Sequence, residues 1–186
     1  MARETAPAPP RFREVLRSLS QARTRADVRL TETPAPTRIA PFAVAVDGEV
    51  TVDGAQATGR FVVLHDPDGQ DAWDGDLRIV ALVKATVEQE VGRDDLWAEV
   101  AWSWLAESLS DVPHREVGGT VTKVVSTSFG ELASRPDEVQ VELRVSWTPE
   151  DPDIEPHIAA WTDLLATCAG VPPVPDGVSV LPGAAR

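Results

Sequence analysis

Five aspartates stand close together between two predicted strands: Asp66, Asp68, Asp71, Asp74 and Asp76. Carboxylates interleaved with glycines can bind a hard cation such as calcium. The register departs from that of an EF-hand, because Gly69 is the fourth residue counted from Asp66, whereas an EF-hand requires a glycine at the sixth. We therefore predict a solvated hairpin loop here and assign no metal ligand.

Histidine is scarce, and no pair of histidines has a metal-binding spacing such as HExxH. His65 precedes Asp66 at the end of a predicted strand, where a catalytic base could act; the alternative is a partly buried polar end of the strand. The single cysteine, Cys168, shares a predicted helix with His157 but lies about 16 Å from it along the axis, too far for a Cys–His pair. Ser126 stands in no GxSxG elbow. The sequence thus predicts no catalytic residue and no cofactor.

The chain contains six tryptophans and no tyrosine. Trp97 and Trp104 fit the apolar stripe of a predicted helix, Trp102 falls at the edge of that stripe, and Trp73 lies in the acidic loop. Exposed tryptophan is enriched in binding hot spots, and the alternative is core packing. Our candidate binding residues are Trp73, Asp74, Trp102, His65 and Asp66.

Alternating apolar and polar residues predict the strands that position these side chains. The clearest run from Val139 to Trp147, and others are predicted at 28–31, 42–46, 48–52, 58–65, 77–88 and 120–128. Asp47-Gly48 and Asp66-Pro67-Asp68-Gly69 are typical of turns. Helices are predicted over 12–22 and 95–109 and after Asp153. This order predicts an α+β two-layer sandwich: a mostly antiparallel sheet of five to seven strands with about three helices.

Composition favours one globular domain at 11–170, with a disordered segment at 1–10 and a Pro/Gly-rich tail at 171–186. The net charge is −13, and the basic residues gather near the N-terminus, so the acidic body is expected to repel nucleic acid and membrane surfaces. The first helix could instead be a basic surface for a partner. A single cysteine and the lack of an apolar leader or spanning segment predict a cytoplasmic protein.

Several stretches together resemble a known family. They include ATGRFVVLHDPDG, AWDGDLRIVALVKA, GTVTKVVSTSFGEL and VELRVSWTP. The chain resembles the actinobacterial domain-of-unknown-function family numbered 3000, over roughly residues 11–170. The resemblance implies a high-GC Gram-positive source and supplies no activity, cofactor or site. The order of elements also resembles that of secretion-chaperone-like domains, which implies protein binding and a dimer.

Two functions are compatible with these features. The favoured hypothesis is a non-enzymatic protein-interaction or adaptor domain with an unidentified protein partner, and a homodimer is among the expected states. The alternative is a small-molecule or metal-binding domain, or a weak hydrolase, using the Asp66–Asp76 loop and His65. A pocket lined by His65, Asp66 and Ser126 would favour the alternative.

Overall fold

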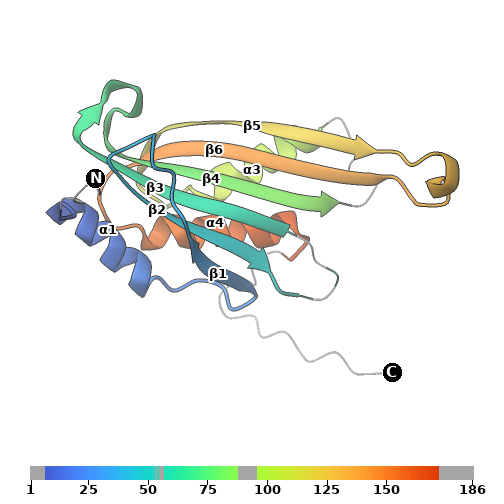
Figure 1. Ribbon diagram of the computed structural model, residues 1–186, viewed down its shortest axis with the longest axis horizontal. Helices are drawn as coiled ribbons and strands as arrows, with labels where there is room; N and C mark the ends of the chain where they lie inside the picture. The colour runs from blue at the N-terminus through green and yellow to red at the C-terminus, as the bar shows by residue number, and fades with distance from the viewer. Residues whose placement is uncertain (1–6, 53, 55–56, 88–95, 172–186) are drawn as a thin grey trace, which may run out of the picture.

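The computed structural model describes residues 7–52, 54, 57–87 and 96–171 (Figure 1). Six strands form one sheet in the order β1-β2-β3-β4-β6-β5, and every neighbouring pair is antiparallel. Along the described chain the elements are α1 (Pro10–Gln21), β1 (Val28–Thr33), β2 (Phe42–Val50), β3 (Ala57–Gln70), η1 (Asp71–Trp73), β4 (Gly75–Val87), α3 (Trp97–Ser108), β5 (His114–Ser126), η2 (Gly130–Leu132), β6 (Glu138–Pro149) and α4 (Glu155–Cys168).

The helices cover one face of the sheet and leave the other open. Helix α4 packs across β2, β3 and β4, while α3 contacts α4 and β5, and α1 contacts α4 (Figure 1). The predicted α+β two-layer sandwich is therefore confirmed, with six antiparallel strands and three α-helices among the described residues. None of the helices in the described ranges has the length and apolar character needed to cross a membrane.

The alternation along β6 shows how the sequence sets the two faces. The residues Val139, Val141, Leu143, Val145 and Trp147 are buried beneath the helices. Their neighbours Glu138, Gln140 and Arg144 are exposed on the open face. Because side chains alternate in a strand, burying one set exposes the other. This strand was correctly predicted, and so was the face that it buries.

Two glycines on neighbouring strands form the seat of Trp161 from α4. Gly48 of β2 pairs with Gly59 of β3, and an added Cβ atom would approach the Trp161 ring to 2.7 Å and 2.8 Å, respectively. The indole Nε1 donates a hydrogen bond to the Leu82 carbonyl at 3.2 Å. The predicted turn at Asp47-Gly48 is therefore wrong: β2 runs straight through it, and Gly48 serves close packing instead.

The first and last helices are joined by one hydroxyl group. Ser18 Oγ in α1 accepts hydrogen bonds from the backbone N–H groups of Ile154 and Glu155, at 2.8 Å and 2.9 Å. It donates its own proton to Asp153 Oδ1 at 2.7 Å. These N–H groups stand at the start of α4, where a helix lacks internal acceptors. Helix α1 thus supplies a cap for α4, while its Phe12 and Val15 are buried in the core.

The β3–β4 connection differs from the predicted one. Strand β3 continues through Asp66-Pro67-Asp68-Gly69 to Gln70 after a shift of register, so the turn predicted at 66–69 is wrong. The chain reverses instead in the 3-10 turn η1 and at Asp74, whose φ is 50°. Strand β5 also begins at His114, six residues before its predicted start.

Candidate functional site

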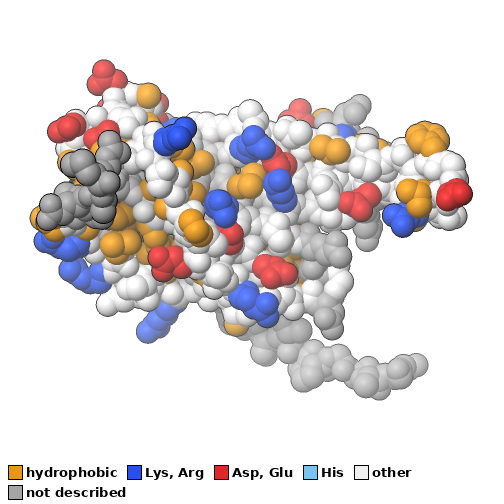
Figure 2. Space-filling model, in the orientation of Figure 1, with side chains coloured by type: hydrophobic (Ala, Val, Ile, Leu, Met, Phe, Trp, Pro, Cys, Tyr) orange, Lys and Arg blue, Asp and Glu red, His pale blue; other side chains and the backbone are white. Residues whose placement is uncertain are grey.

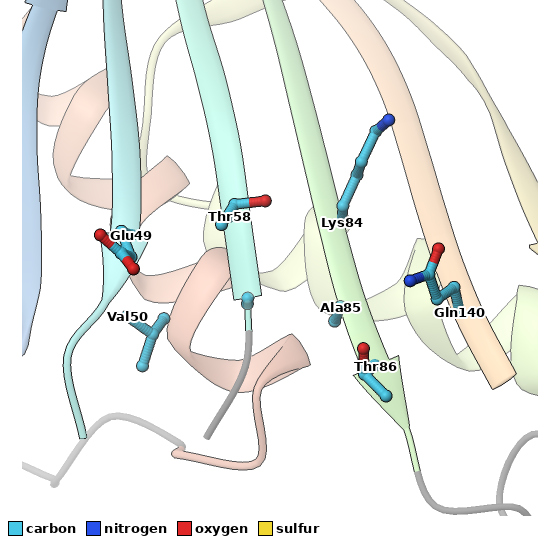
Figure 3. A pocket seen from close by; sticks show the side chains of 8 residues that line it. Glu49, Val50, Thr58, Lys84, Ala85, Thr86 and Gln140 are labelled. Carbon is cyan, nitrogen blue, oxygen red and sulfur yellow. The ribbon is translucent and has the colours of Figure 1, made fainter. Parts of the chain in front are cut away.

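The open face of the sheet carries a shallow polar trough across four strands. Its lining comes from β2, β3, β4 and β6, with Glu49, Thr58, Lys84 and Gln140 lying side by side on the exposed surface (Figure 3). The same face shows basic and acidic side chains interspersed, with no single sign dominating (Figure 2). Covalent catalysis requires a nucleophile activated by a neighbouring base. Lys84 lies among threonines, one amide and the Glu49 carboxylate in the trough, and it pairs with Glu142.

Cross-strand ion pairs occupy the charged groups of this face. Arg60 Nε lies 2.6 Å from Asp47 Oδ1, and Lys84 Nζ lies 2.9 Å from Glu142 Oε2. The hydrogen bond from Arg60 lowers the pKa of Asp47, and the one from Lys84 lowers the pKa of Glu142. Exposed pairs of this kind contribute little to stability. We interpret them as register-matched charges on a solvated face rather than as a reactive site.

The structure separates the predicted acidic cluster instead of assembling it. Asp66 accepts hydrogen bonds from the Asp68 N–H and the Gln70 amide, at 3.2 Å and 3.0 Å. Asp74 Oδ2 pairs with Arg115 Nε at 2.9 Å. Asp76 Oδ2 pairs with Arg11 Nε at 2.7 Å. Within the described ranges, no three acidic, histidine or cysteine side chains converge as a metal site would require.

Millimolar calcium is expected to leave the thermal unfolding midpoint unchanged, to within about 1 °C, because a ligand stabilises only a fold that binds it. Differential scanning fluorimetry with calcium, magnesium and excess chelator tests this. A calcium-specific rise that disappears in the Asp66→Asn/Asp68→Asn variant would show that the loop rearranges around a cation.

His65 is buried rather than presented to a substrate. Only 2% of its surface is exposed, and its ring stacks on Phe12 of α1 at a centroid distance of 6.0 Å. Nδ1 lies 3.0 Å from the Asp76 carbonyl oxygen, which can only accept, so Nδ1 carries the proton. Nε2 is buried without a hydrogen-bond partner among the described residues. The imidazole therefore fixes the start of β4 under α1.

The other candidate residues do not gather around His65. Asp66 follows it at an irregularity of β3, where its side chain accepts hydrogen bonds from Asp68 and Gln70. Ser126 pairs with Glu138 at the far end of the sheet, about 35 Å away along the strands. This separation excludes a single pocket that joins His65, Asp66 and Ser126. The arrangement gives the alternative hydrolase hypothesis no support.

The two tryptophans proposed for binding have different environments. Trp73 is buried on the open side of the sheet against Val62 and Leu64, where it closes a small second core. Its carbonyl accepts a hydrogen bond from the Thr148 hydroxyl. Trp102 is half-buried on α3 and packs against the main core. Trp73 thus holds the β3–β4 turn on the sheet, while Trp102 keeps part of its ring in contact with solvent.

The most exposed apolar surface lies at the end of a hairpin arm. Strands β5 and β6 extend beyond the helices, and hydrophobic side chains are visible at the end of the arm (Figures 1 and 2). At this tip, which we define as residues 127–137, Phe129 is 79% exposed and Leu132 is 48% exposed. Such a patch on a protein surface is a common mark of a binding site.

The tip has a defined backbone structure. The N–H groups of Leu132 and Ala133 donate to the carbonyls of Phe129 and Gly130, at 3.2 Å and 3.1 Å. Gly130 has a φ of 64°, a left-handed value that favours glycine. The resulting 3-10 turn holds Phe129 and Leu132 outward. Sequence reasoning did not select them. The available signal was an apolar residue on each side of Gly130, in a turn-like segment that ends at Pro136.

The fold and these surfaces define a class of protein: an α+β sandwich with one open sheet face and a projecting apolar hairpin arm. A family model described as a protein of unknown function (DUF3000) matches residues 8–179. The chain belongs to this family, as the sequence resemblance implied. The comparisons with curated proteins and with solved structures give no match.

Proposed function

We propose that this protein is a non-enzymatic interaction domain that binds a protein partner through the tip of the β5–β6 arm. The observation that carries the proposal is the exposure of Phe129, 79% of whose surface faces solvent on a well-formed turn. Burying a side chain of this size contributes about 1.5–3 kcal/mol. A partner with an apolar pocket gains that energy with little ordering cost, because hydrogen bonds already fix the turn.

The charged residues around the tip indicate what kind of partner could bind there. Glu131, Arg135 and Glu138 flank the apolar pair, so a polar rim surrounds an aromatic anchor. Protein interfaces combine an apolar centre with a polar rim in this way. The acidic charge of the chain as a whole disfavours nucleic acid as the partner. We propose that this chain and its partner meet in the cytoplasm of an actinobacterial host.

Site-specific photo-crosslinking in living cells tests the proposal. A photoreactive residue in place of Phe129 is expected to capture one protein as a discrete band. The same residue in place of Arg29, on the opposite edge strand β1, is expected to capture none. The captured partner should then lose affinity for the purified Phe129→Ser/Leu132→Ser variant by at least roughly tenfold, which corresponds to 1.4 kcal/mol.

A matched control separates the tip from apolar surface in general. Ile39 is 56% exposed in the loop before β2, at the other end of the sheet. The Ile39→Ser variant should bind the partner as the wild type does. All variants should unfold at the wild-type midpoint, since exposed substitutions rarely change stability. Equal losses in Ile39→Ser and the tip variant, or no capture at position 129, would contradict the proposal.

A further inference from the structure

Strand β5 presents an unusually open sheet edge. It occupies one end of the strand order, and all of its residues are exposed except His114 and Val121, which are half-buried. An edge strand offers its outward N–H and C=O groups to any strand that lies beside it, and proteins usually block such edges with charges or proline. From Val117 to Ser126, β5 has no proline and a single charge, at Lys123. This segment can therefore accept another strand.

We propose that β5 pairs with β5 of a second copy of this chain, antiparallel, around a two-fold axis that passes through Val121. The axis is perpendicular to the sheet, so residues at equal distances from Val121 face each other on the same side. Val121 then faces Val121 of the second copy, and Val117 faces Val125. The two sheets join into one continuous sheet of twelve strands, twice the six of a single chain. The edge of β5 is a different surface from the tip of the arm, which is proposed above to bind a partner.

The apolar residues select this register. Val121 and Val125 pair with Leu143 and Val139 of β6, so they lie on the side of the sheet that the helices cover, and Val125 is 51% exposed. Val117 is 43% exposed and lies at the bulge between Arg115 and Gly118, four residues before Val121. With the axis at Val121, each of these valines meets a valine. Cross-strand pairs of β-branched residues stabilise a sheet. On the open face, Thr120 lies opposite Thr122, which places two hydroxyl groups together.

The position of the lysine argues against the neighbouring registers. With the axis at Val121, Lys123 faces Gly119, which leaves room for its side chain to reach solvent. Axes through Thr120 or Thr122 place Lys123 against a valine. An axis through Lys123 itself places two ammonium groups directly opposite, and like charges in that position are destabilising. The charge pattern and the valine pattern therefore select the same axis.

Helix α3 contacts the strand that forms this edge. It contacts β5 from the helix side of the sheet, so pairing brings the α3 helices of the two copies to the same side of the joined sheet. Val100 on α3 is 39% exposed.

Both copies are strongly acidic, with a net charge of −13 each, so their mutual repulsion weakens the dimer at low salt. Added salt should therefore favour association.

Cysteine crosslinking tests the axis directly. Facing residues in antiparallel strands have Cα atoms about 4.5–5.5 Å apart, within the range of a disulfide. The Val121→Cys variant should crosslink to a covalent dimer as the major product under mild oxidation. The Val125→Cys variant should not, because its two cysteines would lie about 27 Å apart. The native Cys168 does not compete, because it is buried and burial raises the pKa of its thiol to about 12.

Charge pairs test the register in solution. Sedimentation equilibrium should show a wild-type dimer, and Val117→Glu and Val125→Lys should each weaken it at least roughly tenfold. The double variant Val117→Glu/Val125→Lys should recover most of the affinity, because glutamate then faces lysine across the axis. Phe129→Ser/Leu132→Ser should remain dimeric, and Val125→Lys should still bind the partner captured at position 129, so the two proposals fail separately.

Two sets of results would overturn the proposed β5–β5 dimer. A wild-type chain that is monomeric up to high micromolar concentration and a Val121→Cys variant that does not crosslink would overturn it. A dimer that crosslinks through Val125→Cys, or whose affinity the double variant fails to recover, would also overturn it, since the contact would then lie elsewhere or in another register.

Discussion

Replacing Gly59 with alanine is expected to lower the free energy of unfolding by about 2 kcal/mol or more. The new Cβ atom would lie 2.4 Å from the Leu82 carbonyl oxygen and 2.8 Å from the Trp161 ring. The first neighbour is backbone in the central strand β4, which cannot move without disturbing its pairing with β3 and β6. Overpacking of this kind costs typically 1–3 kcal/mol. The shift would also strain the bond from Trp161 Nε1 to the same carbonyl.

Urea unfolding followed by tryptophan fluorescence measures this loss, and Gly118 provides a matched control. Gly118 is also a strand glycine, but an added Cβ atom there would meet no heavy atom within 4 Å. Gly118→Ala should stay within about 0.5 kcal/mol of the wild type. If Gly59→Ala and Gly118→Ala unfold at the same urea concentration, Gly59 is not the seat of Trp161.

Acidification from pH 6.5 to pH 4 is expected to remove roughly 3 kcal/mol of stability through His157 alone. This imidazole is buried, and its Nδ1 accepts the Trp147 indole N–H at 3.0 Å, which requires an unprotonated nitrogen. Burial lowers its pKa from 6.5 to about 4. The unfolded chain therefore binds the proton first as the pH falls. The stabilisation is complete above pH 6.5 and is lost progressively down to pH 4, at 1.36 kcal/mol for each pH unit.

The His157→Asn variant isolates this effect from the titration of carboxylates. The asparagine Oδ1 can accept the indole N–H from nearly the position of Nδ1, and the amide does not titrate. The free energy of unfolding should fall less steeply between pH 6.5 and pH 4 in the variant than in the wild type, by roughly 3 kcal/mol in total. Parallel curves for the two proteins would show that the folded state accommodates a protonated His157.

The strands that were predicted well are those in which a single rule determines the outcome. Val139–Trp147 alternates over nine residues, and only one choice of face buries its valines. The turn at Asp47-Gly48 was predicted wrongly because its local sequence is a good hairpin signal. What overrides that signal is Trp161, more than a hundred residues away, which packs on Gly48. A residue that is small for the sake of a distant partner looks the same in the sequence as one that is small for a turn.

The candidate surfaces were harder to predict than the fold. Trp73 and Phe129 are both aromatic residues in turn-like segments, yet Trp73 closes a small core and Phe129 faces solvent. The difference arises from the arm, which carries Phe129 beyond the elements that could cover it. His65 was a candidate because it ends a predicted strand beside Asp66, but α1 places Phe12 against its ring. Neither outcome follows from local periodicity, because each depends on what lies across the sheet.

The hydrogen bonds of the Ser18 hydroxyl also join two segments that are synthesised at different times. The groups it caps belong to Ile154 and Glu155, so they leave the ribosome long after Ser18 does. At typical elongation rates of about 5–20 residues per second, the nascent first helix waits roughly 7–30 s for its partner. Phe42 and His65, the ring neighbours of Phe12, emerge earlier, but the contact of α1 with α4 is missing during that time. Chaperones that recognise amphipathic helices can therefore bind the first helix until Ile154 and Glu155 have left the ribosome.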